Sequence, residues 1–184
     1  EWMHEIAYDR YRLSRRLDES LLGVPECLLP ANDLMIAKTM HDLGGICAAM
    51  ADYSPVRNFF QRALAIREQA LEPEHLDTAI SLAELASYLK ETGDPADFAA
   101  ARSFYERALA IREQVLGPMH PDTADSLNGL AVYLMMTGEP ADFTAARSLC
   151  ERALSIREQT LGATHPATAP SLNNLAYCLD KTGD

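Results

Sequence analysis

The sequence predicts an all-α fold of stacked antiparallel helix pairs, and two observations lead to this prediction. The segment RALAIREQ begins at Arg62, returns at Arg107, and returns again as RALSIREQ at Arg152, each time 45 residues further along the chain. A fixed period of this length is typical of arrays of small helical units. Within each unit, apolar residues such as Leu127 and Leu130 recur with the spacing of one helix face.

Each unit is expected to hold a helix A and a helix B joined by a short turn. In the third unit, helix A follows His120 with Asp122 or Thr123 as its N-cap, and Gly138 ends it. Helix B follows with Asp142 as its N-cap. The second unit places helix A at about 77–92 and helix B at about 98–116. The second and third units each carry a three-residue insertion, Pro-Ala-Asp, which we expect in the A-to-B turn.

About eight helices are expected in total. Residues 1–32 form a divergent N-terminal helix and loop, and residues 33–184 form the array. The units of the array are about 33–74, 75–119, 120–164 and a closing helix A at 165–184. Because the chain does not begin with methionine and the closing helix has no helix B, we expect it to be part of a longer protein.

Composition excludes several classes of function. The chain has 184 residues, of which 48% are hydrophobic, and a formal net charge of −11. A chain this acidic repels nucleic acid and anionic lipid, so neither is an expected partner. It has no apolar run long enough to span a membrane and no signal-peptide pattern, which favours a cytoplasmic location.

The four cysteines, Cys27, Cys47, Cys150 and Cys178, form no C-x-x-C pair, so no metal site is expected. Cys150 and Cys178 occupy repeat positions that hold aromatic residues in other copies. We therefore expect free, buried thiols. No nucleophile elbow, phosphate-binding loop or dinucleotide-binding turn is present, so neither catalysis nor a cofactor is expected.

The repeats resemble tetratricopeptide repeats of the kinesin-light-chain type. That type carries H-P-D-T-A and S-L-N-N-L-A in helix A, matched here by residues 120–124 and 171–176, and Y-E-R-A-L-A-I-R-E in helix B, matched by residues 105–113. The resemblance covers residues 31–184. It implies a right-handed α-solenoid whose A helices line a concave groove. It also implies a non-catalytic protein that binds peptide segments of partner proteins in that groove.

Two successive copies, residues 95–139 and 140–184, are identical at 30 of 45 positions. The helix-A differences, from Asp125/Pro170 to Met136/Lys181, fall on one arc of the helical wheel at roughly 100° per residue. The unchanged residues, including Leu127 and Leu130, fall on the opposite arc. We interpret the constant arc as the packing face and the variable arc as the lining of the groove.

Candidate peptide-binding residues lie on the variable arc of each helix A. They are Lys38, His41, Glu84, Ser87, Lys90, Asp125, Asn128, Val132, Met135, Asn173, Asn174, Tyr177 and Lys181. Their mixed charge favours a peptide with one apolar anchor near Val132, Met135 and Tyr177. The alternative for Met135 and Met136 is packing under the next repeat.

Some repeated polar residues have two interpretations. The unchanged Asn128 and Asn173 either contact a peptide backbone or bridge residues within the array, and the resemblance favours the peptide. The recurring His75, His120 and His165 are expected to pack or cap in the B-to-A loops rather than to bind a metal. The repeated arginine pairs of helix B are expected to form a solvated ladder with glutamates on the outer surface.

A peptide-binding scaffold is therefore the function that the sequence favours. The alternatives are a regulatory or sensor module of a larger signalling ATPase or protease, and weak self-association through the unpaired apolar face of the closing helix A.

Overall fold

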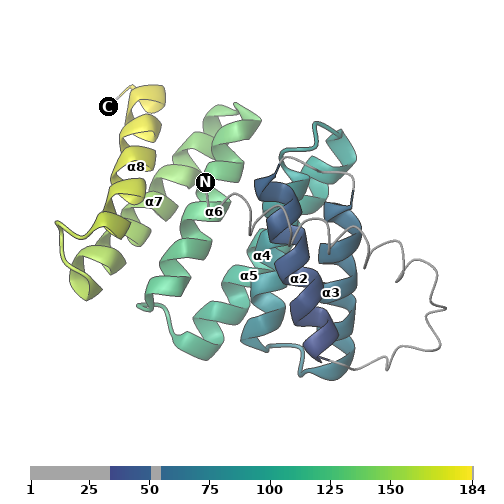
Figure 1. The fold of residues 1–184 in the computed structure, drawn as a ribbon. Helices are drawn as coiled ribbons and strands as arrows, with labels where there is room; N and C mark the ends of the chain where they lie inside the picture. The colour runs from purple at the N-terminus through teal and green to yellow at the C-terminus, as the bar shows by residue number, and fades with distance from the viewer. Residues whose placement is uncertain (1–33, 51–54, 184) are drawn as a thin grey trace, which may run out of the picture. The chain divides into compact units, whose positions relative to one another are not determined.

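The protein is described by a computed structural model that covers residues 34–50 and 55–183. These residues form seven α-helices and one short 3-10 helix and contain no strand (Figure 1), which confirms the all-α prediction. The elements are α2 Leu34–Ala49, α3 Val56–Ala70, α4 Leu76–Leu89, α5 Pro95–Leu116, α6 Pro121–Thr137, α7 Pro140–Thr160, η2 Pro166–Thr168 and α8 Ala169–Thr182. The helix expected near residues 2–22 lies outside the described residues.

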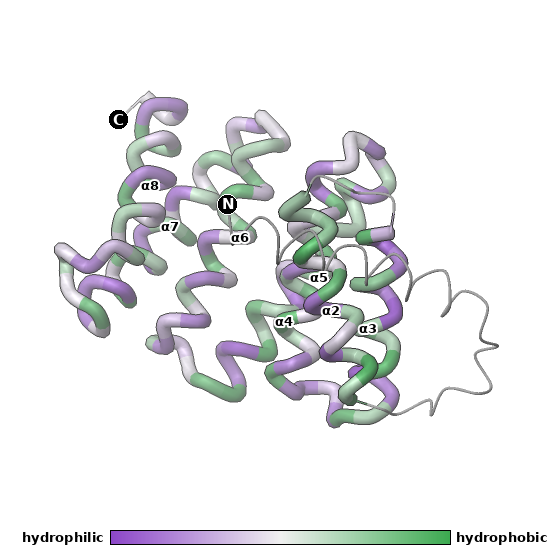
Figure 2. Tube along the Cα trace, viewed as in Figure 1, coloured by the Kyte–Doolittle hydropathy of each residue, from purple (hydrophilic) through white to green (hydrophobic). Residues whose placement is uncertain are grey.

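The chain divides into two compact units at Pro73. In the described part of the first unit, α2 packs against α3, and Gly44 lies directly over the Phe60 ring. A Cβ atom at residue 44 would lie 2.6 Å from Phe60 Cε1, so only glycine fits this helix crossing. The second unit contains the pairs α4–α5 and α6–α7 followed by α8, with each helix in contact with the next along the chain. Figure 2 shows hydrophobic and hydrophilic residues alternating along these helices, as expected of helices that bury one side.

The recurring histidines begin the A helices. His75 and His120 are the N-caps of α4 and α6, and their Nδ1 atoms each accept a hydrogen bond at 3.1 Å from the backbone N–H two residues later. His165 caps η2 in the same way. The prediction of Asp122 or Thr123 as the cap of α6 was therefore wrong. The capping interpretation of the histidines is confirmed, because one side-chain acceptor satisfies an otherwise unpaired N–H of the first turn.

The inserted Pro-Ala-Asp belongs to helix B and not to the turn. Helix α5 begins at Pro95 and α7 at Pro140, so the insertion adds a first turn to each helix. Asp94 caps α5, and Glu139 precedes α7 without a side-chain cap, which contradicts the expected cap at Asp142. The first turn is fixed in α5 because the buried Asp97 accepts a 3.0 Å hydrogen bond from Thr92 Oγ1. Proline tolerates this position because its missing N–H has no partner in a first turn.

The core of the second unit is built from the constant face of the A helices. Leu127 on α6 is fully buried against Ala153 and Ile156 of α7, and Leu82 is fully buried at the same repeat position of α4. Leu172, the same residue one repeat later on α8, keeps 47% of its surface exposed. Each helix A therefore depends on the following helix B to bury its leucines.

The contact between a helix B and the next helix A is made by two tyrosines in one repeat and by two cysteines in the following repeat. The rings of Tyr105 on α5 and Tyr133 on α6 lie 6.2 Å apart between centroids. One repeat later this pair is replaced by Cys150 on α7 and Cys178 on α8, which are fully buried free thiols. Burial and the neighbouring Cys178 raise the pKa of the Cys150 thiol to about 12. Cys47 is also a buried free thiol, and Cys27 lies outside the described residues.

Candidate peptide-binding face

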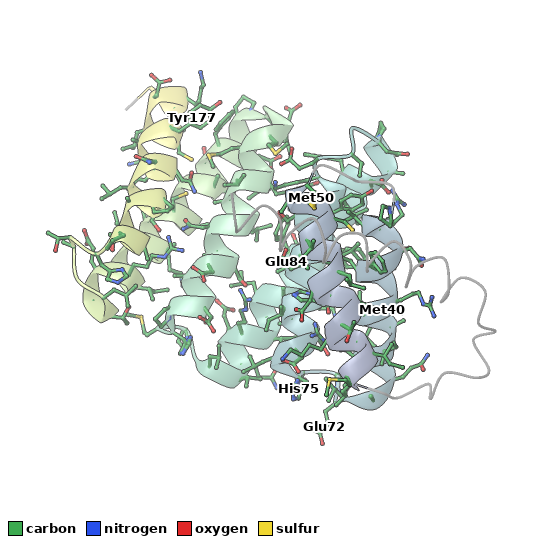
Figure 3. All side chains as sticks on the ribbon, viewed as in Figure 1. Met40, Met50, Glu72, His75, Glu84 and Tyr177 are labelled. Atoms are coloured by element: carbon green, nitrogen blue, oxygen red, sulfur yellow. The ribbon has the colours of Figure 1, made fainter. Side chains whose placement is uncertain are left out.

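Most positions of the variable arc of each A helix in the second unit are accessible, but Tyr133 and its counterpart Cys178, which also differ between the copies, are buried. We call this surface the A-helix face and define it by the following exposed or half-buried residues: Ile80, Glu84 and Ser87 on α4, Glu91 just after the end of α4, Asp125, Val132 and Met136 on α6, and Asn173, Tyr177, Asp180 and Lys181 on α8. Because α4 contacts α6, and α6 contacts α8, these residues form one continuous surface of the second unit. Glu84 and Tyr177 are labelled in Figure 3.

Two predicted site residues belong to the first unit. Lys38 is exposed on α2, and the half-buried His41 packs its ring against Phe60 at 5.8 Å between centroids.

Asn128 does not belong to the accessible surface. Only 7% of it is exposed, and it lies 2.9 Å from Ser171 Oγ on α8. With its amide oxygen turned toward the guanidinium of Arg157, it also accepts a hydrogen bond from Nη1 at 2.5 Å. Asn128 therefore bridges residues within the array, which was the second of its two interpretations. Its counterpart Asn173 on α8 is exposed, because no later helix of the described unit covers it.

Among the repeated arginines, Arg157 connects successive repeats through hydrogen bonds and an ion pair. Arg157 of α7 is buried, donates to Ser171 Oγ at 2.8 Å and forms an ion pair with Asp125. Arg112 of α5 makes the matching 2.8 Å bond to Ser126 of α6. The prediction of a solvated ladder was therefore wrong for these residues, since each crosses from helix B to the next helix A.

Part of the predicted ladder does exist. Arg152 of α7 pairs with Glu113 of α5 at 2.6 Å, and both side chains are partly exposed. The first arginine of each RALAIREQ segment is thus placed differently from the second.

The charges of the A-helix face are layered. Lys90 pairs with Glu91, yet its side chain is only 12% exposed while that of Glu91 is 60% exposed. Asp125 and Arg157 show the same order, with 59% of the carboxylate side chain and 7% of the arginine side chain exposed. Carboxylates therefore lie outside and their cationic partners lie beneath them. Lys90 was predicted as a contact residue, but most of its side chain is covered.

Lys181 is the cation that remains accessible on this face among the described residues of the second unit. Its side chain is 45% exposed, and its ammonium lies 3.6 Å from Asp180 and 5.4 Å from the centre of the Tyr177 ring. Tyr177 is itself 48% exposed and contacts Phe143 at 6.1 Å between ring centroids. Tyr177 therefore presents an accessible aromatic ring with two side-chain neighbours, and aromatic residues are common anchors of protein interfaces.

Tyr105 reaches the A-helix face from below. Residue 129 of α6 is glycine, and a Cβ atom there would lie 3.0 Å from Tyr105 Cε1. Burial raises the pKa of the Tyr105 hydroxyl to about 12, with a hydrogen bond to Ser87 acting in the opposite direction and the charges of Glu84 and Glu91 adding to the rise. The uncharged side chain of Tyr105 thus lies between α4 and α6, under the A-helix face.

The remaining predicted residues are less exposed than the arc suggested. Val132, Met135 and Asn174 are half-buried, whereas Met136 is 46% exposed. Met136 is therefore the more accessible of the two methionines.

Sequence reasoning missed the Arg157–Ser171 bond and the Tyr105–Gly129 contact. The sequence did carry a signal for the Tyr105–Gly129 contact, because both residues change in the next copy, to Cys150 and Asn174. A larger side chain in helix A is thus matched by a smaller one in helix B.

No helix in the described part of the chain is long and apolar enough to cross a bilayer.

Comparisons with known proteins agree on the fold. A model of the tetratricopeptide repeat matches residues 35–97, 96–142 and 141–184. One similar solved structure is a glutamine-to-methionine variant of a putative kinesin light chain with nearly identical TPR-like repeats from Podosopora anserina. It has a TM-score of 0.74 and 23% identity, over 98% of this chain and 84% of that chain. The same protein without that substitution gives a TM-score of 0.72 and 22% identity, over 98% and 85%.

A third similar structure is BtubC (BKLC) from P. vanneervenii, with a TM-score of 0.66 and 20% identity over 97% of this chain and 67% of that chain. No curated protein sequence matches the chain.

Proposed function

The chain belongs to the tetratricopeptide repeat family, and we propose that it is a non-catalytic scaffold that binds a peptide segment of a partner protein on its A-helix face. The observation that carries this proposal is the separation of roles within each A helix. Most buried positions keep their residues from copy to copy, with Tyr133/Cys178 as the exception, whereas most accessible positions change.

The composition of the face supports a peptide rather than a small molecule. Apolar side chains at Ile80, Met136 and Tyr177 are 36%, 46% and 48% exposed, and polar residues separate them along and between the helices. An extended segment can place successive side chains on such spaced apolar positions while its backbone bonds the polar ones. Asn173, which is exposed, offers both a donor and an acceptor for that backbone.

The test is a selection from a randomised peptide library followed by affinity measurements. Peptides of twelve residues are selected on the immobilised 184-residue chain, and the enriched peptides are measured by fluorescence anisotropy against the wild type, Tyr177→Ala and Val115→Ala. Val115 is a matched control, because it is also 48% exposed but lies on α5, a helix B. We expect Tyr177→Ala to weaken binding by about ten-fold or more, as for an aromatic anchor, and Val115→Ala to leave it unchanged.

Binding that survives Tyr177→Ala and disappears with Val115→Ala would show that the partner lies on the B helices. Circular dichroism of each variant shows whether the helices remain folded.

Self-association is a second candidate function, and the exposed packing face of α8 favours it. Leu172 and Ala176 are exposed, whereas their counterparts Leu127 and Ala131 are fully buried beneath the following helices. A second copy that covers this face would bury the same residues. Sedimentation equilibrium at rising concentration should then show dimers that Leu172→Glu removes, and a wild-type monomer throughout the range rules this function out.

A further inference from the structure

We propose that the segment bound on the A-helix face is basic, with lysine or arginine side chains on either side of a large apolar residue. This inference rests on the proposed function and adds the chemistry of the partner to it. It follows from which charges of the face an approaching peptide meets first.

The outermost charges of the face are carboxylates on α6, on α8 and in the turn that follows α4. The side chains of Glu91, Asp125 and Asp180 are 60%, 59% and 75% exposed. Glu84 is exposed as well, and no ion pair involves it among the described residues. The negative charge is therefore accessible along the whole surface and not confined to one helix.

The cations of the same region are less available to a ligand. Lys90 and Arg157 lie beneath the carboxylates that they pair with, with 12% and 7% of their side chains exposed. A buried cation lowers the local charge but cannot form a second contact with an incoming group. Lys181 is accessible, yet it already lies over the Tyr177 ring and beside Asp180.

The partly exposed carboxylates retain acceptor sites for a partner. Each ionised carboxylate has two oxygens and can accept several hydrogen bonds, so Glu91 and Asp125 can bind a second donor without losing the first. Lysine and arginine are the side chains that donate to carboxylates with charge assistance. Acidic groups on the peptide would instead meet like charges from α4, α6 and α8.

The apolar part of the face sets the second requirement. Ile80 and Met136 are exposed on the same face, and the Tyr177 ring is in contact with Phe143 and Lys181. Methionine accommodates side chains of different shape, and a fixed aromatic ring offers a large contact area. A segment that alternates basic residues with one leucine-sized or aromatic residue matches both features.

The experiment is a charge-resolved version of the library selection. Twelve-residue peptides are selected on the wild-type chain, and their net charge is compared with that of the unselected library. The enriched peptides are then measured against Glu84→Gln/Asp180→Asn, which removes two carboxylates from the A-helix face. The control is Glu106→Gln/Glu151→Gln, which removes two carboxylates that are each 51% exposed on the B helices. Both variants change the net charge of the chain equally.

We expect the enriched peptides to carry more lysine and arginine than aspartate and glutamate. Their affinity should fall about 3–30-fold in Glu84→Gln/Asp180→Asn, because exposed pairs contribute modestly at each site, and should stay within two-fold in the control. Raising the salt concentration from 50 to 300 mM should weaken binding to the wild type more than to the first variant.

Two results would overturn the inference and leave the proposed function intact. One is enrichment of neutral or acidic peptides whose binding still depends on Tyr177. The other is an equal loss of affinity in both double variants, since this indicates attraction to the net charge of the chain rather than to this face. Failure to enrich any peptide, or binding that is indifferent to Tyr177, removes the proposed function and this inference with it.

Discussion

Arg157→Ala offers the most direct test of how successive repeats hold together. The wild-type guanidinium, buried on α7, bonds Ser171 of α8 and Asp125 of α6, and thus connects three helices. Its removal deletes the charge-assisted hydrogen bonds to Ser171 and Asp125, each of which contributes about 1.5–3 kcal/mol, together with the bond that Asn128 accepts. Ser171 and Asn128 keep their mutual 2.9 Å bond, and the exposed Asp125 returns to water, so the cost lies near the lower end of this range. We expect a loss of about 3 kcal/mol in the free energy of unfolding.

The assay separates local from global effects. Urea unfolding followed by circular dichroism gives the free energy of unfolding, and hydrogen exchange measured by mass spectrometry reports the opening of residues 171–182. Because α8 packs mainly against α7, with fewer contacts to α6 and η2, its amides should exchange faster in Arg157→Ala before the rest of the second unit does.

Arg152→Ala is the matched control. It removes an arginine five residues earlier on the same helix, whose side chain is 40% exposed and pairs with Glu113 at the surface. Such pairs contribute about 0–1 kcal/mol, so this variant should remain close to the wild type. Equal losses in Arg157→Ala and Arg152→Ala would refute the role given to the buried arginine.

Three further predictions concern the packing of the second unit. Leu127→Ala should lower the free energy of unfolding by about 2–5 kcal/mol, whereas Leu172→Ala at the same repeat position should lower it by less than about 1 kcal/mol, because Leu172 is half-exposed. Equal losses for the two variants in chemical denaturation would contradict this. Gly129→Ala should lower the melting temperature, because the new Cβ presses against Tyr105, and the additional change Tyr105→Cys should restore part of the loss. If the effects of the two substitutions on stability simply add in the double variant, the contact is excluded. The pKa of Tyr105 in the folded protein is about 12, above its ordinary value of 10.0. The neutral tyrosine therefore contributes fully to the free energy of unfolding below pH 10, and this contribution is lost as the pH rises toward 12. Tyr105→Phe should remove about 2 kcal/mol of this alkaline dependence in urea titrations at several pH values.

The repeat made the fold predictable, because copies of one sequence must pack in one way. Periodicity identified the helix pairs and the constant face, and Leu82 and Leu127 are fully buried as that face requires. The helix starts were harder to place. Aspartate and threonine are common caps, and a histidine cap depends on a loop geometry that the sequence does not display. The inserted Pro-Ala-Asp was assigned to a turn for a similar reason, since proline is compatible with both a turn and a first helical turn.

The site was only partly predictable. The variable arc identified Glu84, Asp125 and Tyr177 as accessible, and they are exposed. Asn128 lies on the edge of the same arc, and its burial depends on the neighbouring α8, which a single-helix wheel does not include. The second arginine of each repeat looked like a surface residue because charged residues are rarely buried without a partner. The partners of Arg157 lie 14 and 32 residues away, on two other helices.

The sequence by itself determined that this chain is an array of helix pairs, which face of each helix packs, and which positions are free to vary. These properties follow from local periodicity and from comparison of the copies, and need no knowledge of neighbouring helices. The tertiary structure decided which polar residues are structural and which are accessible. Lys90 and Arg157 lie beneath their carboxylates, and Asn128 bonds across to α8, because hydrogen bonds between repeats form only when the helices stack. The charge that a partner meets on the A-helix face is therefore a property of the stack and not of any single repeat.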